Sequence, residues 1–473
     1  MDKNHGRGKI IKSPFNPTVG SQSMVREIII IGSGAAGMTA ASSARKTDPN
    51  AKITVFTEDS DIAYSPCVIP WAVEGRVAWH NMVMHTPEHY SEKKNIDVLT
   101  KTKVDSVDDS AKTVTAAGRS YKYDSLVIAT GGRVFVPPIK GTDLNGVFVV
   151  RTVQDGKAIQ SYLKDVKGVV VCGAGVIGLE MARAFSDMGK DVTVIEMLDQ
   201  IIPRIADKDM ADPVQKYLEG RGIRFVLNSP VQSVNGIGKV SGVTAGDMEY
   251  PCGMVVFATG VRANTKIPKE LGLDIGQLGA VAASPSMQPY RKEHLVPNIY
   301  VAGDLIQCMS SAVSGPTMSQ LGSSAVRQGN VAGINAAGGK ALFGPVASPW
   351  VSVIGEKEIA GTGLSLGLAS WYGIDAVYGK AVGLTRARYC PGATEMTVKV
   401  LADAKTHKLI GAQIVAGEEA TGRINWLTSA ITSGTTAEDF LFRSENAYCP
   451  QTSMVKDVVI SAVEDLCEKL KAV

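Results

Sequence analysis

The amino-acid sequence predicts an α/β fold: two Rossmann-like dinucleotide-binding domains followed by a C-terminal α+β domain that we expect to be a dimerisation domain. Two glycine fingerprints of the form GxGxxG each lie between an apolar strand and a helix of mostly small or apolar residues. Each fingerprint is followed by a strand that ends in Ala-Thr-Gly, so the same unit occurs twice. From Pro349 onward Val, Thr and Lys alternate, which is typical of antiparallel strands.

Length and composition agree with this class. A chain of 473 residues is too long for one ordinary core and predicts two or three domains. The net charge is +3 with both signs interspersed, which gives no footprint for nucleic acid or an anionic membrane. No run of eighteen apolar residues occurs, and residues 1–23 lack the apolar core of a signal peptide, so we expect a soluble, cytoplasmic protein without a membrane span.

Changes in composition and periodicity along the chain predict its domain boundaries. Residues 1–23 are polar and without periodicity, and we interpret them as a flexible extension. The first dinucleotide-binding domain is predicted over 24–150 and 280–348, the second over 151–279, and the third domain over 349–473. In the third domain we expect strands near 396–400 and 408–415, and then two helices to the end.

The first fingerprint follows the apolar strand 26–31 and precedes a helix over 38–47 and a strand over 52–56. Its glycines allow a tight turn, the approach of backbone amides to a pyrophosphate, and close packing of helix on strand. An acid is expected after the second strand to hold a ribose hydroxyl; either Glu58 is that acid, or it lies one residue late and Thr57 takes its place. The candidate cofactor residues of this unit are Gly32, Gly34, Ala36, Gly37, Thr57 and Glu58.

The second fingerprint follows the strand 168–171 and precedes a helix over 179–188. Strand 191–195 ends in Glu196, which is placed to accept a hydrogen bond from a ribose 2′-hydroxyl and to repel a 2′-phosphate. It therefore favours NADH, and Arg204 leaves NADPH as an alternative. The candidate residues here are Gly173, Gly175, Ile177, Gly178 and Glu196.

Three later segments repeat a strand followed by a turn. The strands that end at Ala129-Thr130-Gly131 and Ala258-Thr259-Gly260 suit a chain that passes a bound dinucleotide, although a structural turn explains the first equally well. The strand 299–301 leads to Gly303-Asp304, whose carboxylate either accepts from a hydroxylated chain such as the ribityl of FAD or caps a helix.

Cys67 is the candidate redox centre. It stands in Ser65-Pro66-Cys67-Val68-Ile69-Pro70-Trp71, where we expect the two prolines to fix φ and to prevent regular hydrogen bonding on both sides. A small buried cysteine is the alternative interpretation. The chain has seven cysteines and none forms a CxxC pair, which excludes a zinc ribbon and fits a reducing compartment. No metal site is predicted.

Taken together, the fingerprints, the two Ala-Thr-Gly turns and Gly303-Asp304 resemble the pyridine nucleotide-disulfide oxidoreductase family over residues 24–473. The lone Cys67 resembles its single-cysteine branch, which includes coenzyme A-disulfide reductase, NADH oxidase, NADH peroxidase and polysulfide or persulfide reductases. The resemblance implies that the first fingerprint and Asp304 bind FAD, that the second binds NADH or NADPH, and that the third domain forms a homodimer. Val68 and Trp71 depart from the usual Cys-Gly-Leu-Pro-Tyr of the branch.

The same resemblance suggests roles for other positions. Asn446-Ala447-Tyr448-Cys449-Pro450 is similar to a segment that brings a tyrosine from the partner subunit to the active site, which makes Tyr448 a second catalytic candidate. Cys449 is either a second thiol near Cys67 or a packing residue. Peroxidase and oxidase members carry a histidine where this chain has Ala35, which favours a sulfur substrate. Arg45 and Lys46 either meet the phosphates of coenzyme A or form an ordinary solvated helix face.

We therefore expect an FAD-dependent NAD(P)H oxidoreductase that passes electrons through Cys67 to a small-molecule disulfide, persulfide or polysulfide, including a coenzyme A derivative. The alternatives are an NADH oxidase that uses oxygen, an electron-transfer subunit of a larger complex and a non-enzymatic redox sensor. In the electron-transfer subunit Cys67 would be incidental.

Overall fold

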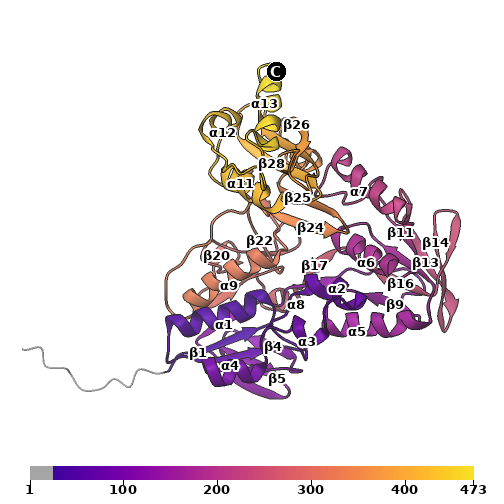
Figure 1. Cartoon of the computed structure of the whole chain (residues 1–473). Helices are drawn as coiled ribbons and strands as arrows, with labels where there is room; N and C mark the ends of the chain where they lie inside the picture. The colour runs from indigo at the N-terminus through magenta and orange to yellow at the C-terminus, as the bar shows by residue number, and fades with distance from the viewer. Residues whose placement is uncertain (1–24, 473) are drawn as a thin grey trace, which may run out of the picture.

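The computed structural model describes residues 25–472, so the predicted extension over 1–23 lies outside the described residues. A first parallel sheet forms the lower part of the molecule in Figure 1. Its five strands, in spatial order, are β21 (Ile299–Val301), β7 (Ser125–Ile128), β1 (Glu27–Ile31), β2 (Lys52–Phe56) and β3 (Ile96–Leu99). All four neighbouring pairs are parallel, as a Rossmann-like unit requires.

Two helices cover one face of this sheet and lie side by side in Figure 1: α1 (Ala35–Thr47) and α9 (Gly322–Ala336). They approach closely because α9 has glycines at the contact. A Cβ at Gly329 would lie 2.2 Å from the Ala36 carbonyl oxygen, and one at Gly333 would lie 2.2 Å from that of Ala40. The predicted strand, helix and strand over 26–56 are confirmed, with the helix beginning three residues earlier than expected.

The second parallel sheet repeats this arrangement. Its strands, in spatial order, are β12 (Arg224–Val226), β11 (Asp191–Ile195), β10 (Gly168–Cys172), β16 (Met254–Phe257) and β9 (Val147–Val149). The helices that follow its strands are α5 (Val153–Tyr162), α6 (Val176–Asp187) and α7 (Lys208–Gly220). Ile31 pairs with Phe56 in the first sheet as Cys172 pairs with Ile195 in the second, so the duplication extends to strand register.

Each unit also carries a three-stranded antiparallel sheet. The first has β4 (Val104–Asp108), β5 (Thr113–Ala116) and β6 (Arg119–Lys122); the second has β13 (Val231–Ile237), β14 (Lys239–Ala245) and β15 (Met248–Pro251). In the first of these sheets, the outer strands β4 and β6 are not among the strands that the sequence predicts. The strands missed there are largely exposed and lack an apolar face.

The third sheet is wholly antiparallel and lies in the upper part of Figure 1. Its order is β24 (Trp350–Ile354), β25 (Lys357–Gly363), β28 (Leu409–Ala416), β27 (Glu395–Asp403) and β26 (Ala376–Leu384). The prediction of two final helices was wrong, because three follow: α11 (Ala420–Thr432), α12 (Ala437–Arg443) and α13 (Val458–Leu470). Gly434 at φ +67° ends the first, and the Thr436 hydroxyl caps the second.

Shorter elements connect the sheets. They are α3 (Trp79–Met82), α4 (Pro87–Lys94), α8 (Lys266–Glu270), α10 (Leu366–Trp371), η2 (Leu163–Asp165), β8 (Gly132–Val134), β17 (Val261–Ala263), β18 (Val281–Ala282), β19 (Tyr290–Arg291), β20 (His294–Leu295), β22 (Ile306–Met309) and β23 (Pro316–Thr317). Within residues 25–472, no helix combines the length and apolar character that a membrane crossing requires.

The Cys67 segment folds differently from our expectation. Pro66–Val68 form a 3-10 turn, η1, that runs directly into the helix α2 (Ile69–Glu74). The expectation that the prolines prevent regular hydrogen bonding was therefore wrong. Both prolines occupy the first positions of a helical segment, where no amide hydrogen is needed and the fixed φ is helical.

Candidate functional site

One large cavity, of about 1460 Å³, contains Cys67 and most of the predicted cofactor residues of the first unit. Segments from all three sheets contribute to its wall. Cavities that bind one small ligand measure roughly 300–1000 Å³, so this cavity has room for a large ligand or for two. The predicted site residues that line it are Gly32, Gly34, Ala36, Thr57, Glu58, Cys67, Ala129, Thr130, Gly131, Ile177, Gly303 and Asp304.

The first glycine loop has the geometry that its sequence predicts. Gly32 has φ +110°, and a Cβ there would lie 2.2 Å from the Ala129 carbonyl oxygen. A Cβ at Gly37 would lie 1.9 Å from the Gly32 carbonyl oxygen. Gly34 is the N-cap of α1 and has open space where its Cβ would be, so the backbone amides at the start of α1 meet the cavity without obstruction.

The structure distinguishes Thr57 from Glu58. The shared register places Thr57, directly after β2, at the position that Glu196 holds after β11. Thr57 is buried and accepts a hydrogen bond of 3.0 Å from the Ser33 hydroxyl. Glu58 lies next to it on the cavity wall, exposed, with Lys103 at 3.8 Å. The ribose contact thus remains a prediction for both residues, of which Glu58 is the one with an exposed carboxylate on the cavity wall.

The second glycine loop is similar to the first. Gly173 has φ +104°, and a Cβ there would lie 2.5 Å from the Ala258 carbonyl oxygen. A Cβ at Gly178 would lie 2.1 Å from the Gly173 carbonyl oxygen, and Gly175, the N-cap of α6, faces open space. These glycines, together with Glu196 and Gly260, do not line the large cavity, whereas Ile177 does. The helix α6 therefore begins at the second loop and then enters the cavity.

Glu196 supports its own loop. One carboxylate oxygen accepts the Ala174 amide at 2.8 Å and the other accepts the Leu198 amide at 3.0 Å. The side chain is buried. Each oxygen retains a lone pair, so the predicted ribose contact is compatible with this arrangement.

Cys67 is exposed at the cavity wall, in contrast to the alternative of a buried packing cysteine. Tyr64, three residues before it, lines the same cavity. Burial raises the pKa of Tyr64 to about 12, with Asp59 as a second cause. The Tyr64 phenol is therefore neutral over the physiological pH range.

Two polar pairs in the cavity were not foreseen from the sequence. Arg151 Nη2 lies 2.8 Å from Asp304 Oδ2. Asp304, the residue predicted to contact the ribityl chain, therefore forms an ion pair with a residue 153 positions earlier in the sequence. Glu180, on α6, accepts a hydrogen bond of 2.6 Å from Ser352 on β24. Burial raises the pKa of Glu180. The position of Glu180, two residues after Gly178, is a local signal that could have identified it; Arg151 has none.

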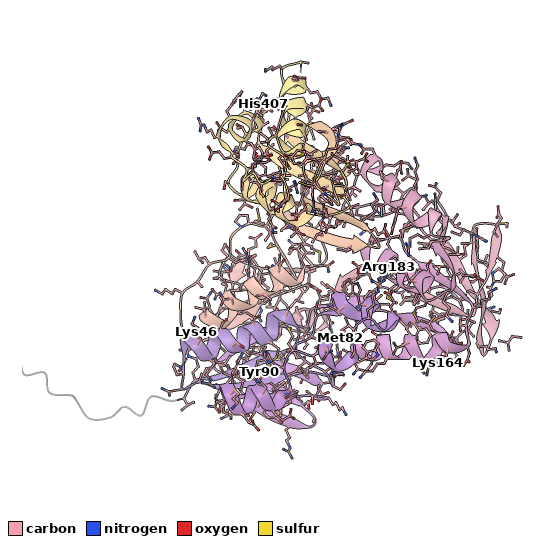
Figure 2. The ribbon with its side chains drawn as sticks, viewed as in Figure 1. Lys46, Met82, Tyr90, Lys164, Arg183 and His407 are labelled. Atoms are coloured by element: carbon pink, nitrogen blue, oxygen red, sulfur yellow. The ribbon has the colours of Figure 1, made fainter. Side chains whose placement is uncertain are left out.

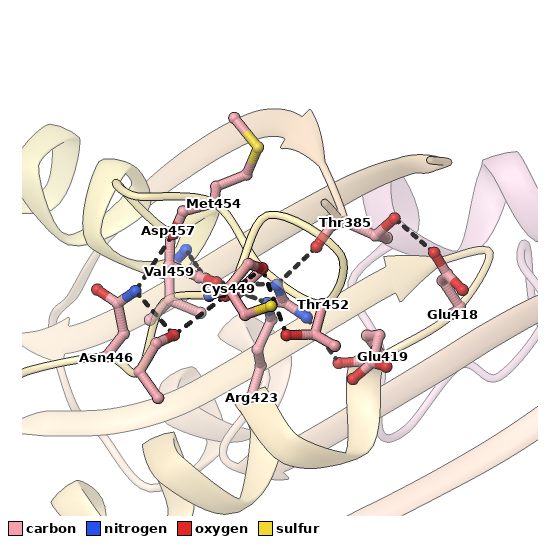
Figure 3. Close-up of polar contacts among 12 residues, drawn as sticks. Thr385, Glu418, Glu419, Arg423, Asn446, Cys449, Thr452, Met454, Asp457 and Val459 are labelled. Atoms are coloured by element: carbon pink, nitrogen blue, oxygen red, sulfur yellow. Dashed lines mark hydrogen bonds and ion pairs between the residues drawn. The ribbon is translucent and has the colours of Figure 1, made fainter. Parts of the chain in front are cut away.

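The Tyr448 segment lies away from the cavity of its own chain. Tyr448 is half exposed, and a hydrogen bond with Tyr389 is the main cause that raises its pKa. Figure 3 shows the neighbouring loop: the Cys449 amide donates to the Ser453 hydroxyl at 3.0 Å. Arg423, also labelled in Figure 3, pairs with Asp457 at 2.9 Å. The role of Tyr448 across a dimer remains a prediction.

The Arg45 side chain forms hydrogen bonds with the protein backbone. Its guanidinium donates to the carbonyl oxygens of Lys94, Asp48, Pro49 and Asn95, at 2.6–3.3 Å. Lys46 next to it is exposed. This arrangement favours the solvated helix face over the coenzyme A phosphate site.

Two family models match the chain. Residues 26–329 match "Pyridine nucleotide-disulphide oxidoreductase" and residues 350–458 match the dimerisation domain of the same family. The chain is 44% identical to an NADH oxidase of Methanocaldococcus jannaschii over 450 residues, 93% of this chain and 99% of that protein. It is 32% identical to an NAD(P)H coenzyme A polysulfide/persulfide reductase of Pyrococcus horikoshii, covering 93% and 98%.

Solved structures agree. An NAD-dependent persulfide reductase from A. fulgidus matches with a TM-score of 0.90 at 32% identity, covering 94% of this chain and 84% of that one. An FAD-dependent pyridine nucleotide-disulphide oxidoreductase from Desulfovibrio vulgaris matches with a TM-score of 0.75 at 27% identity, covering 94% and 100%. The chain belongs to the pyridine nucleotide-disulphide oxidoreductase family and is an oxidoreductase that uses FAD and a pyridine nucleotide.

Proposed function

We propose that the protein uses NADH to reduce the sulfur of a disulfide, persulfide or polysulfide, with the Cys67 thiol as the group that attacks this sulfur. One observation carries the proposal: Cys67 is an exposed thiol in the same cavity as the first glycine loop and the start of α6. A packing cysteine would have no reason to lie there. The sulfur reductases of P. horikoshii and A. fulgidus support the choice of acceptor.

The first unit fits FAD. The open space at Gly34 is a cradle that any Cβ would narrow, and it faces the cavity at the start of a helix of 13 residues. We assign the diphosphate to this loop, the adenosine ribose to Glu58 or Thr57, and the ribityl hydroxyls to Asp304, whose carboxylate Arg151 orients. Ala129, Thr130 and Gly131 complete this wall. When bound, FAD supplies a ring that accepts a hydride and returns two electrons to sulfur.

The second unit fits NADH. Glu196 is a buried carboxylate that accepts two backbone amides, and no cation pairs with it among residues 25–472. A 2′-phosphate there would bring a second anion against it, so we assign NADH as the preferred nucleotide. Gly173, Gly175 and Gly178 shape its diphosphate site, and Ile177 and Glu180 carry the site into the cavity.

The proposed sulfur chemistry begins with an exchange between a thiolate and a disulfide. The Cys67 thiolate attacks R–S–S–R′, the Cys67–S–R bond forms, the S–S bond breaks and R′S⁻ leaves. Tyr448 of the partner subunit donates the proton that this thiolate takes up and regains a proton from solvent. Two electrons from NADH then break the mixed disulfide, which releases RSH and restores the Cys67 thiolate for the next cycle.

We also propose that the protein is a homodimer formed by residues 349–473. Residues 350–458 match the dimerisation domain of the family. Val382 on β26, Phe442 on α12 and Val455 before α13 are large apolar side chains exposed in the single chain. A second copy that covers them would bury apolar surface. Light scattering of the purified protein tests the mass.

The decisive experiment compares Cys67→Ser with Cys449→Ser, since both cysteines are exposed and only Cys67 lines the cavity. Each purified holoprotein is assayed anaerobically with NADH and either polysulfide, a disulfide or ferricyanide. We expect Cys67→Ser to lose at least 100-fold in sulfur reduction and to keep ferricyanide reduction, and Cys449→Ser to keep both. Sulfur reduction that survives in Cys67→Ser would refute the proposal.

NADH oxidase activity is the second candidate, because the M. jannaschii relative at 44% identity is an NADH oxidase. Ala35 stands where oxidase members carry a histidine, which argues against it. Oxygen uptake with NADH, compared with anaerobic sulfur reduction by the same preparation, decides between them. An oxygen turnover that exceeds every sulfur turnover would favour the oxidase.

A further inference from the structure

The helix that follows Cys67 fixes where the thiol lies. Cys67 is the middle residue of the 3-10 turn, and Val68, the last residue of that turn, is the N-cap of α2. No flexible residue separates Cys67 from the helix. A shift of α2 therefore moves the thiol by a comparable distance.

The helix α2 packs into the core of the second nucleotide-binding unit, although its sequence lies within the first. Ile69, Ala72 and Val73 are fully buried and share a hydrophobic cluster with Val153 and Ile159 of the second unit. A Cβ at Gly156 of α5 would lie 2.9 Å from Ile69 Cγ2, so α5 and α2 are in close contact. The position of Cys67 therefore depends on the unit that we assign to NADH.

Polar contacts tie the carboxyl end of α2 to the same unit. Gln160 on α5 donates from its side-chain amide to the carbonyl oxygens of Ala72 and Val73, at 2.9 and 3.0 Å. Both carbonyls belong to the last turn of α2; that of Ala72 also accepts the Gly75 amide at 3.1 Å, so Gln160 is its second donor. The Gln160 carbonyl oxygen accepts in turn from the Trp79 indole at 2.9 Å.

Arg183 on α6 makes the buried charged contact, and the more exposed Arg76, just after α2, also pairs with Glu74 at 2.6 Å and with Asp187 at 3.5 Å. Arg183 is 2% exposed, and Figure 2 labels it on the helix α6. Its Nη2 lies 2.9 Å from Glu74 at the end of α2, and its Nη1 lies 2.7 Å from Asp187 on α6. Asp187 also meets Arg221 at 2.5 Å, which extends the network to the end of α7.

A buried ion pair of this kind is poorly explained by stability alone, because the cost of removing both charges from water often equals the attraction gained. It does define geometry, since a guanidinium held by two carboxylates has little freedom. Arg183 lies one helical turn after Glu180, the α6 residue on the cavity wall. The same rigid helix thus faces the nucleotide site at one end and holds the Cys67 helix one turn later.

We propose that Arg183 is a positioning residue for Cys67: by binding Glu74 it holds α2 against α6 and fixes the thiol relative to the nucleotide-binding helix. Arg183 does not line the cavity and touches no substrate. The inference rests on the proposed function of Cys67, but it concerns where that thiol lies and not which acceptor it reduces.

The test uses Arg183→Gln with Lys399→Gln as a matched control. Lys399 is also 2% exposed and pairs with two carboxylates, Asp207 at 2.9 Å and Asp209 at 2.8 Å, between the third sheet and α7. Both variants therefore remove a buried cation from two anions. Lys399 has no contact with α2 in the described residues.

Two readouts separate positioning from general loss of stability. The first is the rate at which iodoacetamide alkylates Cys67 in the holoprotein, followed on the Cys67 peptide by mass spectrometry. The second is the split between KM for NADH and kcat for sulfur reduction. We expect Arg183→Gln to change the alkylation rate at least threefold and to lower kcat about tenfold with KM for NADH within twofold of wild type. Lys399→Gln should leave all three within twofold.

The conservative variants complete the design. Glu74→Gln breaks the same contact from the α2 side and should reproduce the effect of Arg183→Gln on the alkylation rate. If Arg183→Gln does not fold, Glu74→Gln tests the proposal in its place. Arg183→Lys keeps the charge and should restore at least half of the lost kcat. Equal effects of Arg183→Gln and Lys399→Gln on alkylation, or none from Glu74→Gln, would overturn the proposal. Failure of the proposed function would appear separately, as sulfur reduction that survives Cys67→Ser.

Discussion

The hydroxyl of Ser352 on β24 donates a hydrogen bond of 2.6 Å to the carboxyl group of Glu180 on α6, across 172 residues of chain. Ser352 belongs to the third sheet and Glu180 lines the cavity, so the segment predicted to form the dimer also supports a group on the cavity wall. Burial is the main cause that raises the pKa of Glu180, while this hydrogen bond and the charge of Arg183 lower it.

Ser352→Ala is expected to raise the pKa of Glu180 further, because it removes a donor that stabilises the carboxylate. A folded-state pKa above the ordinary value favours the protonated form, whose contribution to stability is lost as pH rises through that pKa. The variant should therefore lose about 1 kcal/mol of unfolding free energy near neutral pH and progressively less in acid. Urea unfolding at several pH values measures this. Ser311→Ala is the control, since its hydroxyl is buried without a hydrogen-bond partner in the described chain.

Arg151→Met should weaken FAD binding at least tenfold, because the Asp304 carboxylate would lose the ion pair of 2.8 Å that orients it. Release of FAD fluorescence on dilution gives the dissociation constant. Arg291→Met is the matched variant: its ion pair with Asp109 has a similar exposure and lies outside the cavity. Comparable FAD loss in both variants would contradict the assignment.

Gly34→Ala should impair FAD binding, whereas Gly37→Ala should impair the stability of the fold. A Cβ at Gly34 meets no protein atom within 4 Å but faces the cavity, so this variant should fold normally and bind FAD poorly. A Cβ at Gly37 would lie 1.9 Å from a backbone oxygen, so this variant should lose several kcal/mol of stability. Thermal unfolding of the FAD-free proteins distinguishes the two variants. A Gly34→Ala protein that is itself destabilised would contradict the assignment of the open space at Gly34 to FAD.

Glu196→Ser should lower kcat/KM for NADH about 100-fold, since the Ala174 and Leu198 amides lose their acceptor together with the ribose contact. The preference for NADH over NADPH should also fall, because the repelling charge is gone. Glu196→Gln is the milder variant: it removes the charge and keeps one acceptor oxygen, so that only one of the two amides loses its partner. Unchanged nucleotide preference in both variants would remove Glu196 from the ribose site.

Tyr448→Phe should leave stability within about 0.5 kcal/mol, as expected for a half-exposed hydroxyl, and lower sulfur reduction at least tenfold. Mixed dimers test the subunit of origin. A dimer of one Cys67→Ser chain and one Tyr448→Phe chain retains one complete site if the tyrosine acts across the interface, and none if it acts within its own chain. About half of wild-type activity in the mixed dimer is the expected result.

The glycine loops and Cys67 could be found from sequence because their signals are local: spacing, flanking strands and a Pro-bounded cysteine. Arg151, Ser352 and the contact of Arg183 with Glu74 could not, since each joins residues more than a hundred positions apart or depends on which helix packs on which. The exposed strands β4 and β6 escaped because they have no buried face to set a period. Pro70 was misinterpreted because proline interrupts a helix at interior positions but is well tolerated in the first turn, where Pro70 lies.

The place of α2 also bears on how this protein can be divided. Residues 69–73 supply core side chains to a sheet whose own strands do not begin until Val147. A fragment cut at the boundary predicted near residue 150 would expose that part of its core to water, whereas a cut that kept residues 66–82 attached would not. Unfolding of the two nucleotide units should accordingly be a single cooperative event, and neither unit should be exchangeable between relatives without the helix that carries the thiol.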